Sequence, residues 1–148
     1  MFKKFKFNQF ETFSELIHAV SPRCFTNEQG ETEEFSFRGK DEFGKTNFHV
    51  ELFLESIGIA NNKLFLVNQI HSDKIFILDD ASLASSEAVK VSADALLTHL
   101  PGKPLGIFTA DCLPVLIYDP RLKVIGAIHA GRKGSEQSII LKVVREMG

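Results

Sequence analysis

Three side chains of the sequence have the chemistry to bind a metal ion or to act in nucleophilic catalysis: His71, Cys112 and His129. Each lies at the end of a strand-like run or in a turn, where side chains can converge on one cleft. Two imidazoles and one thiolate bind Zn²⁺ and leave a fourth position open. The same residues allow a thiol nucleophile, Cys112, with one histidine as its base. A buried thiol and hydrogen-bonded histidines without a site are the third interpretation.

The elements expected to position these residues are mostly strands. Apolar runs between turn residues predict strands at residues 64–67, 74–78, 105–109, 114–118 and 124–129. Alternating phenylalanines predict another strand within residues 1–13. Apolar residues at helical spacing predict a helix at residues 48–57, closed by Gly58, and a second at residues 135–147. The core-facing side of the second helix is expected to carry Ile139, Ile140, Val143, Val144 and Met147.

Length and composition exclude other classes of protein. The chain has 148 residues and a net charge of −2, which fits one globular domain and gives no overall attraction to nucleic acid or anionic lipid. Its longest run without a charged residue is nine residues, against the roughly 20 that a membrane-spanning helix needs. No apolar signal segment follows the basic N-terminus, so we expect a cytoplasmic protein in which Cys24 and Cys112 are reduced.

Five short motifs surround the candidate residues in a fixed order. They are residues 69–71 (QIH), 93–98 (ADALLT), 109–116 (TADCLPVL), 119–120 (DP) and 129–131 (HAG). The series resembles the laccase-like polyphenol oxidoreductase family, also called the peptidoglycan editing factor and purine nucleoside phosphorylase/adenosine deaminase family. The dense match runs from Gln69 to Gly134, a little under half of the chain. The simplest role of Asp94, in the second motif, is to fix a turn.

The resemblance implies a fold class and how much of the family's fold this chain contains. The fold is α+β, an α/β sandwich with mixed β-sheets, which suits the strand-rich pattern. We expect residues 1–148 to form a single domain of this type, short relative to the family. Family members carry a further G-P-x-I-G segment beyond the last helix, so the C-terminal part of the fold is expected to be absent. A sheet edge exposed in this way could pair with a second copy of the chain, giving a homo-oligomer.

The resemblance also implies a metal site and an activity. It assigns the metal ligands to His71, Cys112 and His129, with Zn²⁺ as the expected ion. The family is credited with phosphorolysis of adenosine, inosine, guanosine and methylthioadenosine, and with adenosine deamination, so the expected partners are a purine nucleoside and phosphate. Zinc can lower the pKa of a bound water toward about 7 and so supply hydroxide for deamination.

Further side chains are expected to assist this chemistry. Asp111, next to Cys112, could accept or return a proton, which with Cys112 and His129 completes the predicted catalytic set. Arg132 and Lys133 lie between two glycines at the start of the last helix, where cations and backbone N–H groups can hold phosphate. Arg23 resembles part of the family's early T-x-R segment and is a candidate second anion contact.

The chain departs from the family at one important motif, and three other functions remain open. The family's H-A-G-W-R-G reads HAGRKG, so Arg132 replaces a tryptophan and Lys133 replaces an arginine that can bind anions bidentately. The alternatives are a Cys112–His129 thiol hydrolase acting on a peptidoglycan precursor, a degenerate domain without catalysis, and a copper polyphenol oxidase. Copper is the weaker cofactor choice, because a laccase needs many histidines and this chain has five.

Overall fold

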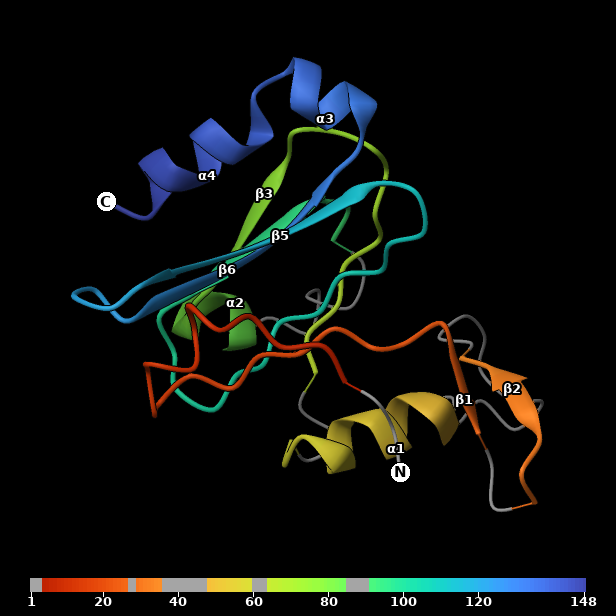
Figure 1. Ribbon diagram of the computed structural model, residues 1–148. Helices are drawn as coiled ribbons and strands as arrows, with labels where there is room; N and C mark the ends of the chain where they lie inside the picture. Colours follow the sequence, from red (N-terminus) through yellow and green to blue (C-terminus); the bar gives the residue numbers. More distant parts are fainter. Residues whose placement is uncertain (1–3, 27–28, 36–47, 60–63, 85–90) are drawn as a thin grey trace. The chain divides into compact units, whose positions relative to one another are not determined.

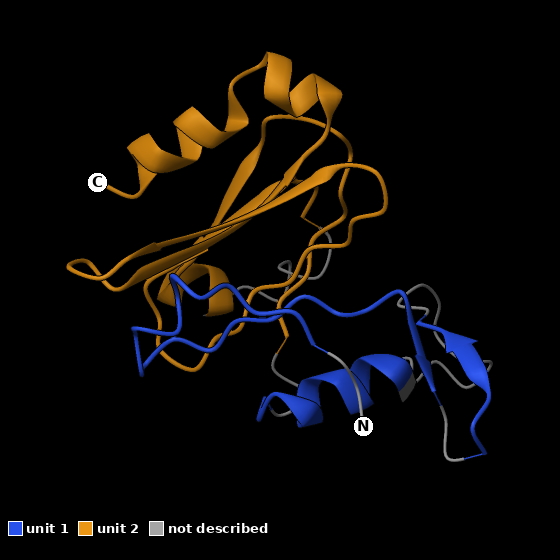
Figure 2. Ribbon diagram, in the orientation of Figure 1, with its two compact units in different colours: residues 1–62 blue, residues 63–148 orange. Residues whose placement is uncertain are grey.

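The computed structural model describes residues 4–26, 29–35, 48–59, 64–84 and 91–148 of the chain (Figure 1). The chain divides into two compact units, residues 1–62 and residues 63–148 (Figure 2). The single-domain organisation predicted from the length and the resemblance stays a prediction. Among the described residues, no helix combines the length and the apolar character needed to cross a membrane.

A four-stranded sheet forms the centre of the second unit, with its strands in the order β3-β4-β6-β5. The strands are β3 (Ile75–Leu78), β4 (Ala95–Thr98), β5 (Leu113–Asp119) and β6 (Val124–Ala130). β3 and β4 run parallel, whereas β6 is antiparallel to both β4 and β5. The mixed sheet confirms the predicted α+β class. β5 lies at one edge of the sheet, where a second copy of the chain could pair. The predicted homo-oligomer stays a prediction.

One face of this sheet is covered by the C-terminal helices, α3 (Arg132–Glu136) and α4 (Ile139–Glu146) (Figure 1). The core between them contains seven buried side chains: Ala95, Leu97, Ile128, Ala130, Ile139, Val143 and Met147. Gly126 lies opposite Leu97 in the β4–β6 register, and a Cβ at Gly126 would stand 2.8 Å from Leu97 Cδ2. Glycine at this position therefore lets a large leucine fill the middle of the core. A short helix, α2 (Asp80–Ala84), follows β3.

The first unit contains α1 (Phe48–Ser56) and a two-stranded antiparallel sheet of β1 (Cys24–Thr26) and β2 (Thr32–Glu34). Aromatic rings fill it: Phe25, Phe35 and His49 lie edge-on or tilted against one another, with ring centroids 5.1 to 5.4 Å apart. After α1, Gly58 adopts a positive φ of 79°, the left-handed conformation expected of a glycine that closes a helix. This confirms the predicted end of the helix.

Three predicted strands are wrong, because each pairs over a single position only. Residues 64–67 and 105–109 contribute one parallel bridge, Phe65 with Leu105, and the described part of residues 1–13 contributes one bridge, Phe5 with Val20. An apolar run shows that a segment is partly buried, but it does not show how long a neighbouring backbone stays within hydrogen-bonding distance.

The predicted helix at residues 135–147 is two helices rather than one. Ser138 has a left-handed backbone, with φ 61° and ψ 40°, and it separates α3 from α4. The turn sets Ile139, Val143 and Met147 on the buried side, whereas Val144 is 50% exposed and Ile140 is 36% exposed. The predicted core-facing stripe is therefore correct at three positions and wrong at these two.

Candidate metal centre

His71, Cys112 and His129 come together from three separate segments of the second unit. One ring nitrogen of each histidine and the Cys112 sulfur all lie within 4.8 Å of one another. The two imidazole rings stand nearly perpendicular, at 84°, with their centroids 4.8 Å apart. His129 is buried in β6, Cys112 is half-buried just before β5, and His71 is exposed in the loop before β3. No other group of three potential metal ligands occurs in the described part of the chain.

Strand pairing explains why Cys112 and His129 meet. β5 and β6 are antiparallel neighbours, with Pro114 opposite His129 and Leu113 opposite Ala130. Cys112 directly precedes Leu113, so the register of these two strands brings its sulfur to the end of β6. The position of Cys112 relative to His129 thus follows from backbone hydrogen bonds of the sheet.

A buried carboxylate orients the two histidines. Asp94 is fully buried, and its Oδ1 lies 2.9 Å from His129 Nδ1. The same carboxylate accepts hydrogen bonds from the backbone N–H groups of Ile70 at 3.3 Å, His71 at 3.0 Å and Ser72 at 2.6 Å. It also accepts the Ser72 hydroxyl at 2.8 Å. Asp94 therefore connects the strand that carries His129 to the loop that carries His71.

These contacts determine the charge of Asp94 and the tautomer of His129. Burial alone would raise the pKa of Asp94, but the hydrogen bonds from His129, Ser72 and His71 outweigh it and lower the pKa below its usual value. The carboxylate is therefore ionised at neutral pH and accepts a proton-bearing nitrogen. His129 Nδ1–H is assigned as the donor, which leaves the lone pair of Nε2 available on the other side of the ring.

The backbone of His71 is held in an uncommon conformation. Its φ is +58°, in the left-handed region that non-glycine residues rarely adopt. Such a conformation costs about 1–2 kcal/mol and persists only where other contacts compensate for it. The hydrogen bond from the His71 N–H to the ionised Asp94 is such a contact. The carboxylate thus determines both where His71 lies and how it is presented.

Glycines allow the ligand segments to approach closely. A Cβ at Gly131 would stand 3.2 Å from Cys112 Sγ and 3.2 Å from His71 Cδ2, so a larger residue would crowd the space between the ligands. A Cβ at Gly134, in α3, would stand 2.7 Å from the Ser72 carbonyl oxygen. The His71–Ser72 loop therefore rests directly on the backbone of α3. An ion pair between Lys142 of α4 and Asp73 holds the far side of the loop. The hydrogen bond from Lys142 also lowers the pKa of Asp73.

The donor set fits a metal ion in kind as well as in position. Nitrogen and thiolate ligands suit Zn²⁺, which takes three protein ligands at catalytic sites. Histidine ligands of such sites donate their second ring nitrogen to a carboxylate, as His129 donates to Asp94. A multi-copper centre needs several ligand groups, and the described residues contain the one group.

The other predicted site residues occupy different positions. Asp111 is exposed beside Cys112, and Lys133 is exposed next to Arg132 at the start of α3. Arg132 Nη1 lies 3.3 Å from Glu136 Oε1 on the same helix. Arg23 lies in the first unit, exposed, with its Nη2 3.3 Å from Glu34 Oε1. The structure thus brings the three predicted ligands together. Arg132 and Lys133 directly follow Gly131, three and four residues after His129 in the chain.

The residue of the candidate site that the sequence analysis missed is Asp94, which was interpreted as a turn residue. The one signal of its role is that it lies inside an apolar strand motif, where an ionisable side chain must be hydrogen-bonded.

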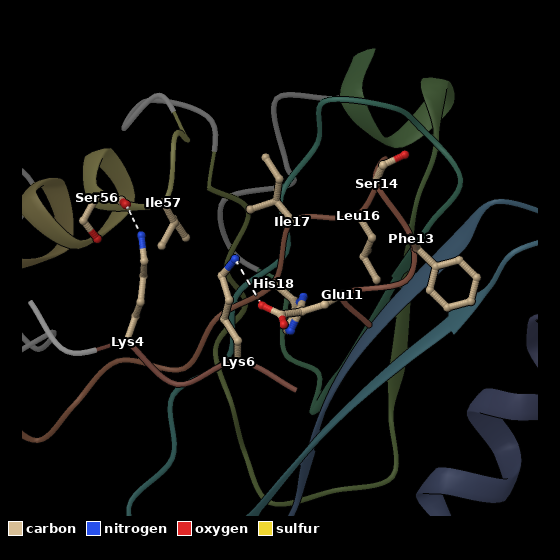
Figure 3. A pocket seen from close by; sticks show the side chains of 10 residues that line it. All are labelled: Lys4, Lys6, Glu11, Phe13, Ser14, Leu16, Ile17, His18, Ser56 and Ile57. Atoms are coloured by element: carbon tan, nitrogen blue, oxygen red, sulfur yellow. Dashed lines mark hydrogen bonds and ion pairs between the residues drawn. The ribbon is translucent and has the colours of Figure 1, made fainter. Parts of the chain in front are cut away.

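A cavity of about 600 Å³ in the first unit holds none of the predicted site residues (Figure 3). Both of its lysines are already paired: Lys4 donates to the Ser56 carbonyl, and Lys6 lies 3.7 Å from Glu11. His18 Nε2 accepts the Phe7 N–H at 2.8 Å. Burial, with a smaller effect of Lys6, lowers the pKa of His18. This cavity is therefore a weaker candidate site than the three converging ligands.

Known proteins resemble this chain in both sequence and structure. The family model described as multi-copper polyphenol oxidoreductase laccase matches residues 18–148. A purine nucleoside phosphorylase of Bacteroides thetaiotaomicron is 31% identical, over 96% of this chain and 56% of the relative. A purine nucleoside phosphorylase of Corynebacterium glutamicum is 40% identical over 62% of this chain and 36% of the relative. An adenosine deaminase from an unknown prokaryotic organism is 33% identical over 62% of this chain and 36% of the relative.

A solved structure has a similar fold. Bacillus licheniformis hypothetical protein YfiH superposes with a TM-score of 0.58 at 29% identity, covering 66% of this chain and 38% of that one. The chain spans between 36% and 56% of the length of the curated relatives named above.

The close approach at Gly134 gives a prediction for the Gly134→Ala variant. The new methyl group would meet the Ser72 carbonyl, a backbone atom that cannot rotate away. We expect a loss of about 1–3 kcal/mol in the free energy of unfolding, the usual cost of overpacking, together with a shifted Ser72 amide resonance. Chemical denaturation and amide NMR spectra would measure both.

Gly102→Ala is the matched control. Gly102, unlike the helical Gly134, has a positive φ of +70°, and nothing lies near its missing Cβ. This variant should lose stability through backbone strain alone and should leave the Ser72 amide in place. An unmoved Ser72 amide in Gly134→Ala would show that the loop does not rest on α3.

Proposed function

The chain belongs to the multi-copper polyphenol oxidoreductase laccase family, and from this we propose that it is a zinc-dependent enzyme acting on purine nucleosides. The proposed reactions are phosphorolysis of adenosine, inosine, guanosine or methylthioadenosine, and deamination of adenosine. The observation that carries the proposal is the convergence of two imidazoles and one thiolate, with His129 oriented by the buried Asp94. Relatives named purine nucleoside phosphorylase and adenosine deaminase support it.

In this proposal His71, Cys112 and His129 hold the metal ion. A bound Zn²⁺ would supply a Lewis acid and would lower the pKa of water toward about 7. Asp94 keeps His129 in the tautomer that offers Nε2 as a ligand. Asp111, exposed beside Cys112, accepts or returns the proton that moves during the reaction. Because the Cys112 ligand must be reduced, the proposal includes a cytoplasmic location.

Phosphate binding is assigned to Arg132 and Lys133, and Arg23, in the first unit, is proposed separately as an anion contact. The Arg132–Glu136 and Arg23–Glu34 pairs are exposed, and such pairs contribute about 0–1 kcal/mol. Bound phosphate, which carries more charge than one carboxylate, can therefore replace the glutamate partner at little cost. Lys133 offers a point charge rather than a bidentate fork, so this site orients phosphate less strictly than two arginines would.

A thiol hydrolase acting on a peptidoglycan precursor is the second candidate function. The Asp94–His129 hydrogen bond, followed by the nearby Cys112 sulfur, has the order of an acid–base–nucleophile triad. Such an enzyme needs no metal, and alkylation of Cys112 would inactivate it whether or not a chelator is present. Zinc dependence distinguishes the first proposal from this one.

Incubation with adenosine tests the proposed activity. Zinc-loaded protein should convert adenosine to adenine only when phosphate is present, to inosine by deamination, or to both, and HPLC would separate the products. His71→Ala should lose at least about 100-fold in kcat/KM, because it removes a metal ligand. His99→Ala, which changes an exposed histidine outside the motifs, should keep the wild-type rate.

The outcomes separate the candidates. Conversion of adenosine that survives a strong chelator but disappears on alkylation of Cys112 would favour catalysis by the thiol over catalysis by a metal ion. Absence of any product from the zinc-loaded wild type would contradict the proposal and favour a domain without catalysis.

Substitution of the two cations tests the phosphate assignment. The double variant Arg132→Ala and Lys133→Ala should raise the KM for phosphate about tenfold or more, because it removes two charge-assisted contacts, while deamination of adenosine changes little. Arg121→Ala is the control, since Arg121 is an exposed arginine that pairs with Asp119 at the β5–β6 turn. An unchanged KM for phosphate in the double variant would contradict the assignment.

A further inference from the structure

Hydrogen bonds connect the loop that carries Cys112 to the segment that carries His71. The first of them are between backbone groups, and the later ones involve a side chain. The Phe65 N–H donates to the Pro104 carbonyl at 2.9 Å, and the Gly106 N–H donates to the Phe65 carbonyl at 2.9 Å. The two segments thus run parallel at the Phe65–Leu105 bridge. Both then continue toward their metal ligands.

Beyond the Phe65–Leu105 bridge, the side chain of Gln69 takes the place of backbone hydrogen bonds between the two segments. Its Nε2 donates to the Phe108 carbonyl at 2.8 Å, and its Oε1 accepts the Phe108 N–H at 2.7 Å. The amide therefore pairs with the peptide groups of Phe108 as a neighbouring strand would, using both its donor and its acceptor. Gln69 is half-buried, which limits competition from water.

The location of this contact matters because ligands lie just beyond it on both sides. His71 follows Gln69 by two residues, and Cys112 follows Phe108 by four. Thr109 continues the ordered loop, since its hydroxyl donates to the Cys112 carbonyl. Each pair of ligands thus has its own connection. Asp94 connects His71 to His129, and the β5–β6 register connects His129 to Cys112.

We propose that Gln69 is a positioning residue that fixes Cys112 relative to His71 through its paired hydrogen bonds to Phe108. The proposal rests on the proposed metal centre for its effect on metal binding, whereas the two hydrogen bonds between Gln69 and Phe108 involve none of the three candidate ligands. Without Gln69, the two histidines stay oriented by Asp94, whereas the sulfur loses one of its two connections. The expected result is a site that binds metal more weakly and with less thiolate character.

Cobalt binding tests this directly, because Co²⁺ bound by a thiolate absorbs in the near-ultraviolet through sulfur-to-metal charge transfer. All proteins would carry Cys24→Ser, which leaves Cys112 as the sole thiol. Gln69→Ala should lose most of the charge-transfer intensity at saturating Co²⁺ and bind Co²⁺ about 10–100-fold more weakly. Gln69→Glu, which cannot donate to the Phe108 carbonyl, should change in the same direction. Cys112→Ser gives the baseline without sulfur.

Asn68→Ala is the matched control, because it removes a neighbouring amide whose Nδ2 donates to Ser92 Oγ at 3.1 Å. It should keep the wild-type spectrum and affinity. Hydrogen exchange of the Phe108 amide in metal-free protein should become faster in both Gln69 variants and should not change in Asn68→Ala. Wild-type spectra and affinity in Gln69 variants whose Phe108 amide exchanges faster would overturn the proposal, since the contact would then be structural only.

Failure of the metal centre would be recognised separately. If wild type and Cys112→Ser give the same cobalt spectrum, the metal assignment of Cys112 is wrong. The position of Cys112 is then compared in metal-free protein by its rate of alkylation with iodoacetamide. A rate that changes in Gln69→Ala and Gln69→Glu but not in Asn68→Ala supports the positioning role, and a rate equal in all of them overturns it.

Discussion

The carboxylate of Asp94 is the group on which the candidate site depends. A fully buried charge is tolerated only where hydrogen bonds replace its hydration, because an unpaired buried ion costs several kcal/mol. In this chain the donors come from the loop at residues 70–72 and from the His129 ring. The need to satisfy one carboxylate therefore determines the path of the loop, the left-handed backbone of His71 and the tautomer of His129.

The sheet and its helices make this arrangement rigid. β4 and β6 are the two central strands, and Asp94 directly precedes β4 while His129 lies in β6. α3 begins three residues after His129, and α4 packs its buried side chains into the core of the sheet. Ligands on strands and short loops of a packed sheet lose little conformational freedom on binding a metal, which favours both affinity and a defined open position. In the proposed function, the exposed His71, Asp111, Arg132 and Lys133 would leave that position accessible to a substrate.

The sequence was sufficient to select the three side chains that converge and to predict most of the sheet, for different reasons. β3, β5, β6 and α1 have strong local patterns, so their existence and type were predicted correctly. His71, Cys112 and His129 were identified by residue type and by the motifs around them. Asp94 was not identified as the organising group, because no local pattern shows which distant N–H groups a carboxylate will accept. Gln69 escaped for the same reason, since its two hydrogen bonds cross 39 positions of the chain. The break at Ser138 depends on how α4 packs on the sheet, which a helical period alone does not contain.

The central claim is that one metal ion is bound by His71, Cys112 and His129. Anomalous diffraction above and below the zinc absorption edge, on crystals of zinc-loaded protein, tests it most directly. The account predicts a single strong peak with the Cys112 sulfur at about 2.3 Å and the two imidazole nitrogens at about 2.0–2.1 Å. Peaks elsewhere on the chain, or a fully loaded crystal with no peak between these three side chains, would contradict it.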